Sequence, residues 1–457
     1  MVKKIMDLNG KNILVVGLAR TGAALCRFLA EKGARVTVTD QALAADLEAF
    51  REEIAGLGVR EELGVPQPQW QGYDLILPSP GVPPETPWLE AARAAGIPVW
   101  GELELASHFI TRPIYAVSGT NGKTTTTTLL GELLQASGCK PLVGGNIGTP
   151  LISLLPRQEE ADCLVIEVSS FQLDTAPSFH PQAGILLNIT PDHLDRYPDF
   201  AGYVASKAGL FRNFGPEDLK VLNADDPWVA ALGSRPGRTY YFSTERPLSQ
   251  GAWVEQGALK VRLASGREEV FPLTDIRLPG RHNLENVMAA LLVALDAGGE
   301  AAPCREVLAS FQGLPHRLEW VGNVGGVDFY DDSKGTNVGA VAQSLTFFNQ
   351  PVVLIAGGRD KDSDFSLLSS LIRDRVKALV LLGETRDRLY SVWEGLAPAF
   401  MAKDMDEAVT QAYQLADPGE VVLLSPACAS FDMFRDYAHR GDAFQRIVGE
   451  LKNARAS

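Results

Sequence analysis

The stretch at residues 119–125 has the composition of a loop that binds phosphate groups. It reads Gly-Thr-Asn-Gly-Lys-Thr-Thr, after a short apolar, β-prone segment and before leucines at helical spacing. Two glycines let the backbone turn tightly so that its N–H groups converge on phosphate oxygens, and the N-terminus of the following helix adds its positive dipole. We expect the ammonium of Lys123 to reach the terminal phosphates and the hydroxyl of Thr124 or Thr125 to hold Mg²⁺.

The loop departs from the commonest phosphate-loop pattern, G-x-x-x-x-G-K-[ST]. Five residues before Gly122 stands Val117, where that pattern has glycine. A glycine turn that merely caps a helix is the plain alternative. The two glycines, the strand before them and the helix after them favour nucleotide binding over that alternative. The ATP contacts expected from the loop are Gly119, Thr120, Asn121, Gly122, Lys123, Thr124 and Thr125.

Two polar sites follow apolar runs further along the chain. Glu167 ends the run that starts at Cys163, and an acid at that place, downstream of a phosphate loop, is expected to hold magnesium rather than only to be solvated. His193 follows the strand expected at 185–189 and has Asp192 on one side. A lone histidine is more often structural, but a histidine among acids at a strand end is a candidate ligand.

The elements that must position these side chains begin with a β-loop-α-β pattern at residues 11–40. Its loop, 17–22, resembles a dinucleotide fingerprint, but Ala19 replaces the middle glycine. Nicotinamide binding, binding of another nucleotide-containing ligand and a tight strand-to-helix turn all remain open from these residues. The proline-rich loop at 78–84 follows another strand and would line a ligand crevice or form a rigid surface turn.

The length of 457 residues suggests about three domains, and the alternation of strands with helices predicts an α/β protein. Residues 221–273 alternate between short β-prone runs and turns, as a peripheral part of the central domain. Apolar runs of strand length between 351 and 424 predict a third, mostly parallel sheet. The boundaries expected are 1–101, 102–312 and 313–457.

Charge and composition limit the function classes. A net charge of −14 argues against a protein that coats nucleic acid. Five scattered cysteines without C-x-x-C spacing fit a reducing compartment and no zinc site. No signal peptide is visible, and polar residues and Pro351 interrupt the longest uncharged run, at 335–358, so we expect a cytoplasmic protein without a membrane span.

Taken together, the motifs resemble those of the Mur ligase family over nearly the whole chain. Two of them, at 169–173 and 425–430, favour the branch that adds D-glutamate. The stretches that carry the resemblance are 119–124, 144–148, 167–173, 192–197, 314–317, 332–337 and 424–430.

The resemblance implies three domains: a Rossmann-like N-terminal domain for a UDP moiety, a central P-loop ATPase-like domain with a parallel sheet, and a Rossmann-like C-terminal domain that receives an amino acid. It implies amide formation driven by ATP, with an acyl phosphate and a tetrahedral intermediate. Lys123, His193 and a carbamylated Lys207 are the implied catalytic residues. Two Mg²⁺ ions are implied, with Thr124, Glu167, His193 and Lys207 serving them. Without the resemblance, Lys207 would be a solvated helix lysine.

The resemblance also implies three sets of binding residues. Further ATP contacts fall on Asn283, Asn286, Arg317 and Asp332. The UDP-linked substrate would contact Arg20, Thr21, Ser79, Gly81, Asn146, Ser169 and Gln172. The amino acid would contact Lys334, Thr336, Lys361, Ser430, Phe431 and Tyr437. A dicarboxylic amino acid needs cationic partners, which gives Lys334 and Lys361 a physical reason.

One departure concerns the UDP site, because Gln41 and Ala42 stand where the family often has Thr-Arg. The implied partners are small molecules only, without nucleic acid or membrane, and a monomer is expected. Two rival enzymes remain: a folylpolyglutamate synthetase, which shares the phosphate loop, and a nicotinamide-dependent oxidoreductase built on 17–40. A nucleotide-dependent binding module without catalysis is the third alternative.

Overall fold

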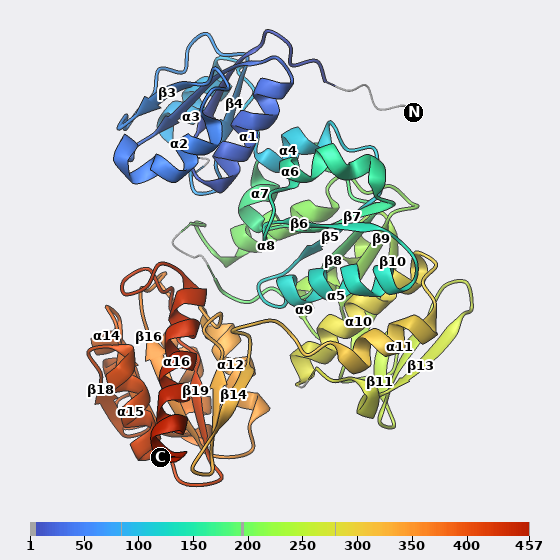
Figure 1. The fold of residues 1–457 in the computed structure, drawn as a ribbon. Coiled ribbons are helices and arrows are strands. Elements are labelled where there is room, and N and C mark those ends of the chain that lie inside the picture. The colour runs from blue at the N-terminus through green and yellow to red at the C-terminus, as the bar shows by residue number, and fades with distance from the viewer. Residues whose placement is uncertain (1–5, 84, 193–195, 279, 457) are drawn as a thin grey trace. The chain divides into compact units, whose positions relative to one another are not determined.

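The computed structural model describes residues 6–83, 85–192, 196–278 and 280–456. The described chain is α/β and contains three sheets (Figure 1). It divides into two compact units. The first holds the described residues up to Ile189 together with Ala201–Arg277 and Leu284–Ser310. The second holds the described residues of Thr190–Phe200, Leu278–Asn283 and Phe311–Ser457.

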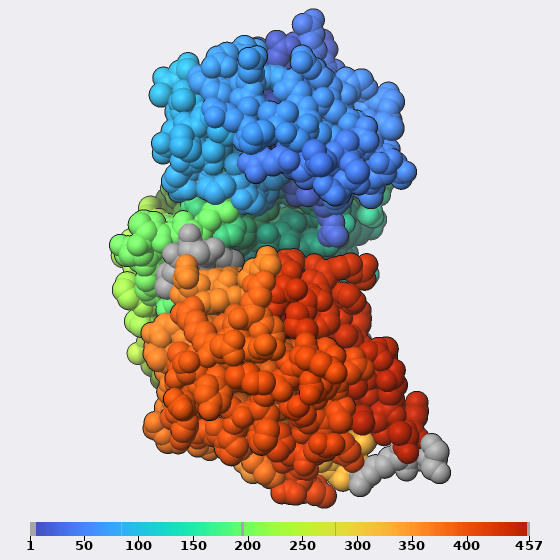
Figure 2. Space-filling model, turned by 90° about the vertical axis from the view of Figure 1, so that its left-hand side faces the viewer, coloured from blue at the N-terminus to red at the C-terminus, as the bar shows by residue number. Residues whose placement is uncertain are grey.

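The N-terminal sheet has four parallel strands in the order β3-β2-β1-β4. Its central strand β1 is the apolar run expected from the sequence, with Ile13 opposite Val36 on one side and Leu75 on the other. These parts of the chain are blue in Figures 1 and 2. The elements are β1 (Asn12–Val16), α1 (Arg20–Glu31), β2 (Arg35–Asp40), η1 (Ala44–Leu47), α2 (Glu48–Ile54), β3 (Arg60–Leu63), β4 (Leu75–Pro78) and α3 (Pro87–Ala94).

The central sheet has nine strands in the order β13-β12-β11-β10-β9-β8-β5-β7-β6. The strands from β11 to β13 pair antiparallel and the others pair parallel. The strands are β5 (Ile114–Ser118), β6 (Pro141–Gly145), β7 (Cys163–Glu167), β8 (Ala183–Leu186), β9 (Leu219–Asn223), β10 (Arg238–Ser243), β11 (Gly251–Glu255), β12 (Ala258–Arg262) and β13 (Glu268–Pro272). The β-prone runs expected at 221–273 are therefore confirmed as strands, and they extend the sheet from β9 in its middle to β13 at one edge.

Helices of the central region connect these strands and pack on the sheet. Helix α5 follows β5 directly and contacts β5, β6 and β7. The helices are α4 (Glu102–Ser107), α5 (Lys123–Ala136), α6 (Leu151–Leu154), η2 (Leu155–Glu160), α7 (Ser170–Asp174), α8 (Phe200–Ala208), η3 (Gly209–Phe211), α9 (Pro227–Ala230), η4 (Ala231–Ser234), η5 (Leu273–Asp275), α10 (Arg281–Asp296) and α11 (Ala301–Ser310).

The C-terminal sheet has six strands in the order β14-β15-β19-β16-β17-β18, parallel except for the β14–β15 hairpin. Its buried apolar strands support the mostly parallel sheet expected for this region. The elements are β14 (Glu319–Val324), β15 (Val327–Asp331), α12 (Val338–Phe347), β16 (Val352–Gly357), η6 (Phe365–Leu368), α13 (Ser369–Arg375), β17 (Val376–Leu382), α14 (Arg386–Trp393), β18 (Ala399–Met401), α15 (Met405–Leu415), β19 (Val421–Leu424) and α16 (Tyr437–Ala456).

The α/β class and the three sheets confirm the predicted fold. One strand is shorter than expected: the run at 185–189 leaves the sheet after Leu186, because Asn188 turns to the loop that follows β5. Within the described residues, no helix has the length and apolar character needed to cross a membrane.

Candidate active site

The predicted phosphate loop lies between β5 and the N-terminus of α5, as the motif requires. Gly119 and Gly122 have φ angles of 151° and 82°, in the region that favours glycine. A Cβ atom at Gly119 would lie 3.1 Å from the Cβ of Leu187, a tight contact that would have to relax if a larger residue stood there. The strand, the glycine turn and the helix are all present, and the N-terminus of α5 can present N–H groups to an anion.

Lys123 extends back over this loop. Its Nζ donates to the carbonyl oxygens of Gly119, at 3.0 Å, and Thr120, at 2.8 Å. The ammonium is therefore held at the loop that would surround the phosphates, where its charge can act on them.

Asn188 is a loop contact that the sequence reasoning missed. Its side-chain oxygen accepts from the N–H of Asn121 at 2.8 Å, its amide donates to the Asn121 carbonyl at 3.2 Å, and its own carbonyl accepts from the N–H of Thr120 at 2.9 Å. Three hydrogen bonds from one residue fix the loop conformation. The only signal in the sequence is a polar residue inside an otherwise apolar run, and the structure shows that this residue is buried.

A second group gathers around the carboxylate of Glu167 at the end of β7. Glu167 is buried, and its two oxygens accept from the hydroxyl of Thr124 at 2.7 Å and the side-chain amide of Asn146 at 2.8 Å. A carboxylate and a hydroxyl beside a phosphate loop are oxygen ligands of the kind that Mg²⁺ prefers. The structure thus brings together both residues predicted to hold the first metal.

Lys207 lies on α8 but is not the solvated helix lysine that its surroundings in sequence suggested. It is 1% exposed, its Nζ donates to the carbonyl of Gly119 at 2.8 Å, and it lies 4.6 Å from the centre of the Tyr203 ring. The hydroxyl of Tyr203 is 3.2 Å from that of Thr120. The predicted second-metal residue is therefore at the phosphate loop, while its predicted partner His193 lies outside the described residues.

Ser169 and Gln172 form a capping box at the start of α7. The hydroxyl of Ser169 accepts from the N–H of Gln172 at 3.3 Å, and the side-chain oxygen of Gln172 accepts from the N–H of Ser169 at 3.0 Å. The pair lies two residues after Glu167, and its predicted contact with the UDP-linked substrate stays a prediction.

The two asparagines of α10 fall in different units. Asn286 accepts from the hydroxyl of Thr126 at 3.2 Å, and a Cβ atom at Gly122 would collide with its side chain, so Asn286 packs against the phosphate loop. Asn283 is buried in the second unit.

The N-terminal sheet gathers its predicted ligand residues at the ends of its strands. The hydroxyl of Ser79 donates to the Gly17 carbonyl at 3.2 Å, and the carboxylate of Asp40 accepts from the N–H of Leu18 at 2.7 Å. Arg20 starts α1 and donates to the carbonyl of Gly148 at 3.2 Å. Thr21 is half-buried on the same helix, and Gly81 is exposed just beyond Ser79.

Asp332, a predicted ATP contact, is buried just after β15. Its carboxylate accepts from the hydroxyls of Ser344 and Ser425, each at 2.7 Å, and from the N–H of Leu318 at 3.3 Å. Burial raises the pKa of this carboxyl to about 6, although the two serine hydroxyls oppose that rise. Arg317, next to Leu318, is half-buried.

The residues predicted to receive the amino acid lie on three loops of the second unit and at the start of α16. The Nζ of Lys334 is 3.9 Å from the centre of the Tyr437 ring, and Lys361 lies 3.7 Å from the carboxylate of Asp192. Ser430 is buried, whereas Phe431 is 63% exposed. Thr336 is half-buried in the same turn as Lys334.

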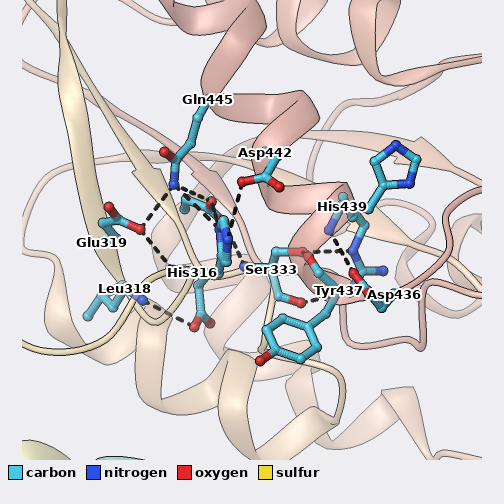
Figure 3. A network of polar contacts seen from close by, with 12 residues as sticks. His316, Leu318, Glu319, Ser333, Asp436, Tyr437, His439, Asp442 and Gln445 are labelled. Carbon is cyan, nitrogen blue, oxygen red and sulfur yellow. Dashed lines mark hydrogen bonds and ion pairs between the residues drawn. The ribbon is translucent and has the colours of Figure 1, made fainter. Parts of the chain in front are cut away.

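Beside these loops lies a polar network that sequence reasoning did not identify (Figure 3). The Nδ1 of His316 lies 2.7 Å from the carboxylate of Asp331, and the amide of Gln445 on α16 donates to Asp331 at 2.9 Å and to Glu319 at 3.0 Å. The hydrogen bond to Asp331 raises the pKa of His316 above its usual value, against the effect of burial. His316, Glu319 and Asp331 are ligand types for a metal, but Gln445 already occupies the position between them.

Three family models together match most of the chain. The model of the Mur ligase MurD-like N-terminal domain matches residues 11–101, that of the Mur ligase middle domain matches 117–294, and that of the Mur ligase glutamate ligase domain matches 316–428.

Curated proteins named UDP-N-acetylmuramoylalanine--D-glutamate ligase are similar over nearly their whole length. The one from Geobacter metallireducens is 48% identical over 448 residues, 98% of this chain and 99% of that protein. The one from Pelotomaculum thermopropionicum is 45% identical over 453 residues, with 98% and 99% covered.

Solved structures share the fold at lower identity. A UDP-N-acetylmuramate-alanine ligase from Thermotoga maritima has a TM-score of 0.59 and 20% identity, covering 97% of this chain and 100% of that one. A pseudomurein peptide ligase from Methanothermus fervidus has a TM-score of 0.61 and 20% identity, with the same coverage.

Proposed function

The chain belongs to the Mur ligase family, and from this we infer that it is the ATP-dependent ligase that adds D-glutamate to UDP-N-acetylmuramoyl-L-alanine during peptidoglycan precursor synthesis. The observation that carries this proposal is the 48% identity over 98% of the chain to a curated ligase of that name. The phosphate loop, with its lysine held at the glycine turn, supports the use of ATP.

The reaction joins a carboxylate to an amine. The carboxylate of the muramoyl-alanine attacks the γ-phosphate of ATP and forms an acyl phosphate, and ADP leaves. The amine of D-glutamate then attacks the acyl carbon, and the tetrahedral intermediate expels phosphate. Because the reactants are anions, the protein must chiefly position and neutralise them, and Lys123 supplies a cation at the phosphate loop.

Magnesium fits the first metal position by the chemistry of its ligands. Glu167 and Thr124 are oxygen donors 2.7 Å apart at the loop, and they would hold the ion with Asn146 orienting the carboxylate. Bound there, Mg²⁺ would neutralise charge on the phosphates.

For the second metal we infer a carbamate on Lys207. The ammonium first loses a proton, and the neutral amine then reacts with CO₂ to give the carbamate and a second proton. A cation is thereby replaced by an anionic group with two oxygens suited to a hard divalent ion. The carbamate nitrogen keeps one N–H, so it can still donate to the Gly119 carbonyl that the amine now contacts. His193 would be the other residue serving this ion.

The remaining contacts divide by substrate. ATP would be held further by Asn283, Asn286, Arg317 and Asp332. The UDP-linked substrate would contact Arg20, Thr21, Ser79, Gly81, Asn146, Ser169 and Gln172. D-glutamate would contact Lys334, Thr336, Lys361, Ser430, Phe431 and Tyr437. All substrates are small molecules, and a monomer in the cytoplasm suffices for the reaction.

The test is phosphate release from ATP in the presence of UDP-N-acetylmuramoyl-L-alanine and a panel of D- and L-amino acids. D-glutamate should give rapid release and a product heavier by one glutamyl residue. Release that needs a different amino acid would reassign the substrate within the family. No release with any amino acid would overturn the ligase assignment.

A further inference from the structure

Arg440, on the first turn of α16, is a buried cation outside every set of residues predicted from the sequence. It is 2% exposed. Its guanidinium donates to the carbonyl and the hydroxyl of Ser333, at 2.7 and 3.0 Å, and to the carbonyl of Cys428, at 3.1 Å. Among the described residues, all the hydrogen-bond partners of this cation are neutral oxygens.

Burying such a group is costly, so its partners must compensate for lost water. Burial lowers the pKa of the guanidinium to about 10, which still leaves it protonated at neutral pH. The acids whose charge acts on it, Asp432, Asp331 and Asp332, hydrogen-bond elsewhere. The guanidinium hydrogen-bonds only to backbone carbonyls and a hydroxyl. We therefore expect it to hold in place the two backbone segments that carry these oxygens.

Those segments are the loops predicted to receive the amino acid. Ser333 directly precedes Lys334, and Cys428 stands two residues before Ser430. Ser333 is fixed from two further directions, because its N–H donates to Asp331 at 2.8 Å and its hydroxyl donates to the carbonyl of Tyr437 at 2.7 Å. One side chain therefore joins the turn after β15, the loop after β19 and the start of α16.

The backbone around this junction is close-packed and partly strained. A Cβ atom at Gly441 would collide with the ring of His316 and lie 2.7 Å from the carboxylate of Asp331, so only glycine lets α16 approach this near. His316, Leu318 and Ala427 have φ angles of 61°, 49° and 60°, in the left-handed region that non-glycine residues rarely adopt. Such strain persists where the surroundings over-determine the backbone, and it gathers at functional sites.

We propose that Arg440 is a positioning residue for the amino-acid substrate: by joining Ser333 and Cys428 it fixes Lys334 and Ser430 in the geometry that binds D-glutamate. The proposal rests on the function proposed above. The planar guanidinium has donors in a fixed fork and reaches three oxygens at once, whereas the single ammonium of lysine cannot bridge the same set.

The experiment compares Arg440→Lys and Arg440→Met with Arg446→Met as the matched control. Arg446 lies on the same helix, but its side chain is 53% exposed and pairs with Glu450. Steady-state kinetics would be measured separately for D-glutamate, ATP and the UDP-linked substrate. Both Arg440 variants should raise the KM for D-glutamate by about 10-fold or more, the effect of losing one hydrogen bond from a charged group, while the KM for ATP changes less than about threefold.

A merely structural role would lower the amount of folded enzyme and leave all three KM values near normal. An unchanged KM for D-glutamate, or an equal rise for all three substrates, would overturn the proposal. If the Arg440 variants do not fold, Ser333→Ala removes one acceptor of the guanidinium and one donor to Tyr437 while the buried charge stays. It should show the same selective rise, smaller in size, and its absence would count against the proposal.

The wild-type enzyme separates this inference from the proposed function. If the wild-type protein releases no phosphate with D-glutamate, the proposed substrate is wrong. If the wild type is active and Arg440→Lys retains its KM for D-glutamate, the function stands and only the positioning role fails.

Discussion

The phosphate loop of the first unit and the turn that carries Lys334 in the second unit each place a lysine just after a parallel strand, but contacts of different range hold them. Lys123 donates to carbonyls three and four residues before it. The turn at Lys334 depends on Ser333, whose carbonyl is held by Arg440, 107 residues further along the chain.

The two regions differ in which parts of the sequence determine the geometry around the lysine. In the phosphate loop one contiguous motif encodes the backbone turn and the helix dipole, and distant residues such as Asn188 and Lys207 then hold the loop in place. In the second unit the geometry exists only once β15, β19 and α16 have packed. Substitutions in the loop should therefore reduce turnover and leave the fold intact, whereas substitutions in the second unit should change stability and substrate binding together.

The largest effect is expected at Lys207, whose role at the loop we assign to a carbamate. Lys207→Ala should be nearly inactive, because the anionic oxygens for the second metal are gone. Acetate at high concentration should restore part of the phosphate release by filling the vacated anion position. The matched control is Lys123→Ala, which loses a cation and should gain nothing from acetate. Full activity of Lys207→Ala in buffer free of CO₂ would remove the carbamate from the mechanism.

A smaller but still large loss is expected for Lys123→Ala. Removing one preorganised charge from the phosphates should lower kcat by about 10²–10³-fold. Binding of the UDP-linked substrate, measured by calorimetry, should survive because its proposed contacts are elsewhere. The exposed Lys140, after α5, gives a control in Lys140→Ala, which should keep normal turnover. Near-normal turnover of Lys123→Ala would show that this loop is not where ATP reacts.

The same contrast between local and long-range contacts explains which parts of the fold and the site could be predicted from the sequence. The three sheets and the phosphate loop follow from apolar runs and from a contiguous glycine motif, both of which are local signals. Asn188 lies 67 residues from Asn121, the loop residue that it holds, and no periodicity reveals such a contact. Arg440 reads as an ordinary helix arginine until α16 is placed against Ser333. Lys207 likewise has the sequence surroundings of a solvated helix lysine, and only the family resemblance points to it.

The pH dependence of stability at Asp332 tests how the long-range contacts of the second unit hold its fold. Its pKa is about 6 in the folded protein against an ordinary 3.8, so the folded state holds the proton more tightly than the unfolded chain. This group therefore stabilises the fold fully below about pH 4, and that contribution, about 3 kcal/mol, is lost as pH rises to about 6. In Asp332→Asn, the free energy of unfolding should decrease less than in the wild type between pH 4 and 6.

Hydrogen–deuterium exchange of peptides covering β15 and β19 would measure this effect on the second unit. The exposed Asp374 on α13 supplies the control, because Asp374→Asn should leave the pH dependence as in the wild type. His316 also has a raised pKa, but its contribution is lost as pH rises above about 6.5. The two pH ranges differ, so the effects of Asp332 and His316 can be told apart. If the stability of Asp332→Asn fell as steeply as that of the wild type between pH 4 and 6, Asp332 would not be the group responsible.

The smallest effect is expected at Ser169, where a local motif has two possible roles. Its hydroxyl caps α7 and so should contribute about 1 kcal/mol to stability, and Ser169→Ala should lower the melting temperature by about one or two degrees. If Ser169 served only as a cap, Ser169→Asp would restore the melting temperature and the activity together, since aspartate also caps helices well. If it also contacts the UDP-linked substrate, as proposed, Ser169→Asp should restore the melting temperature but leave the KM for that substrate raised, because a carboxylate repels the substrate's own anionic groups. If Ser169→Asp restores the melting temperature but not the KM, Ser169 belongs among the residues that bind substrate. If it restores both, Ser169 acts only as a helix cap.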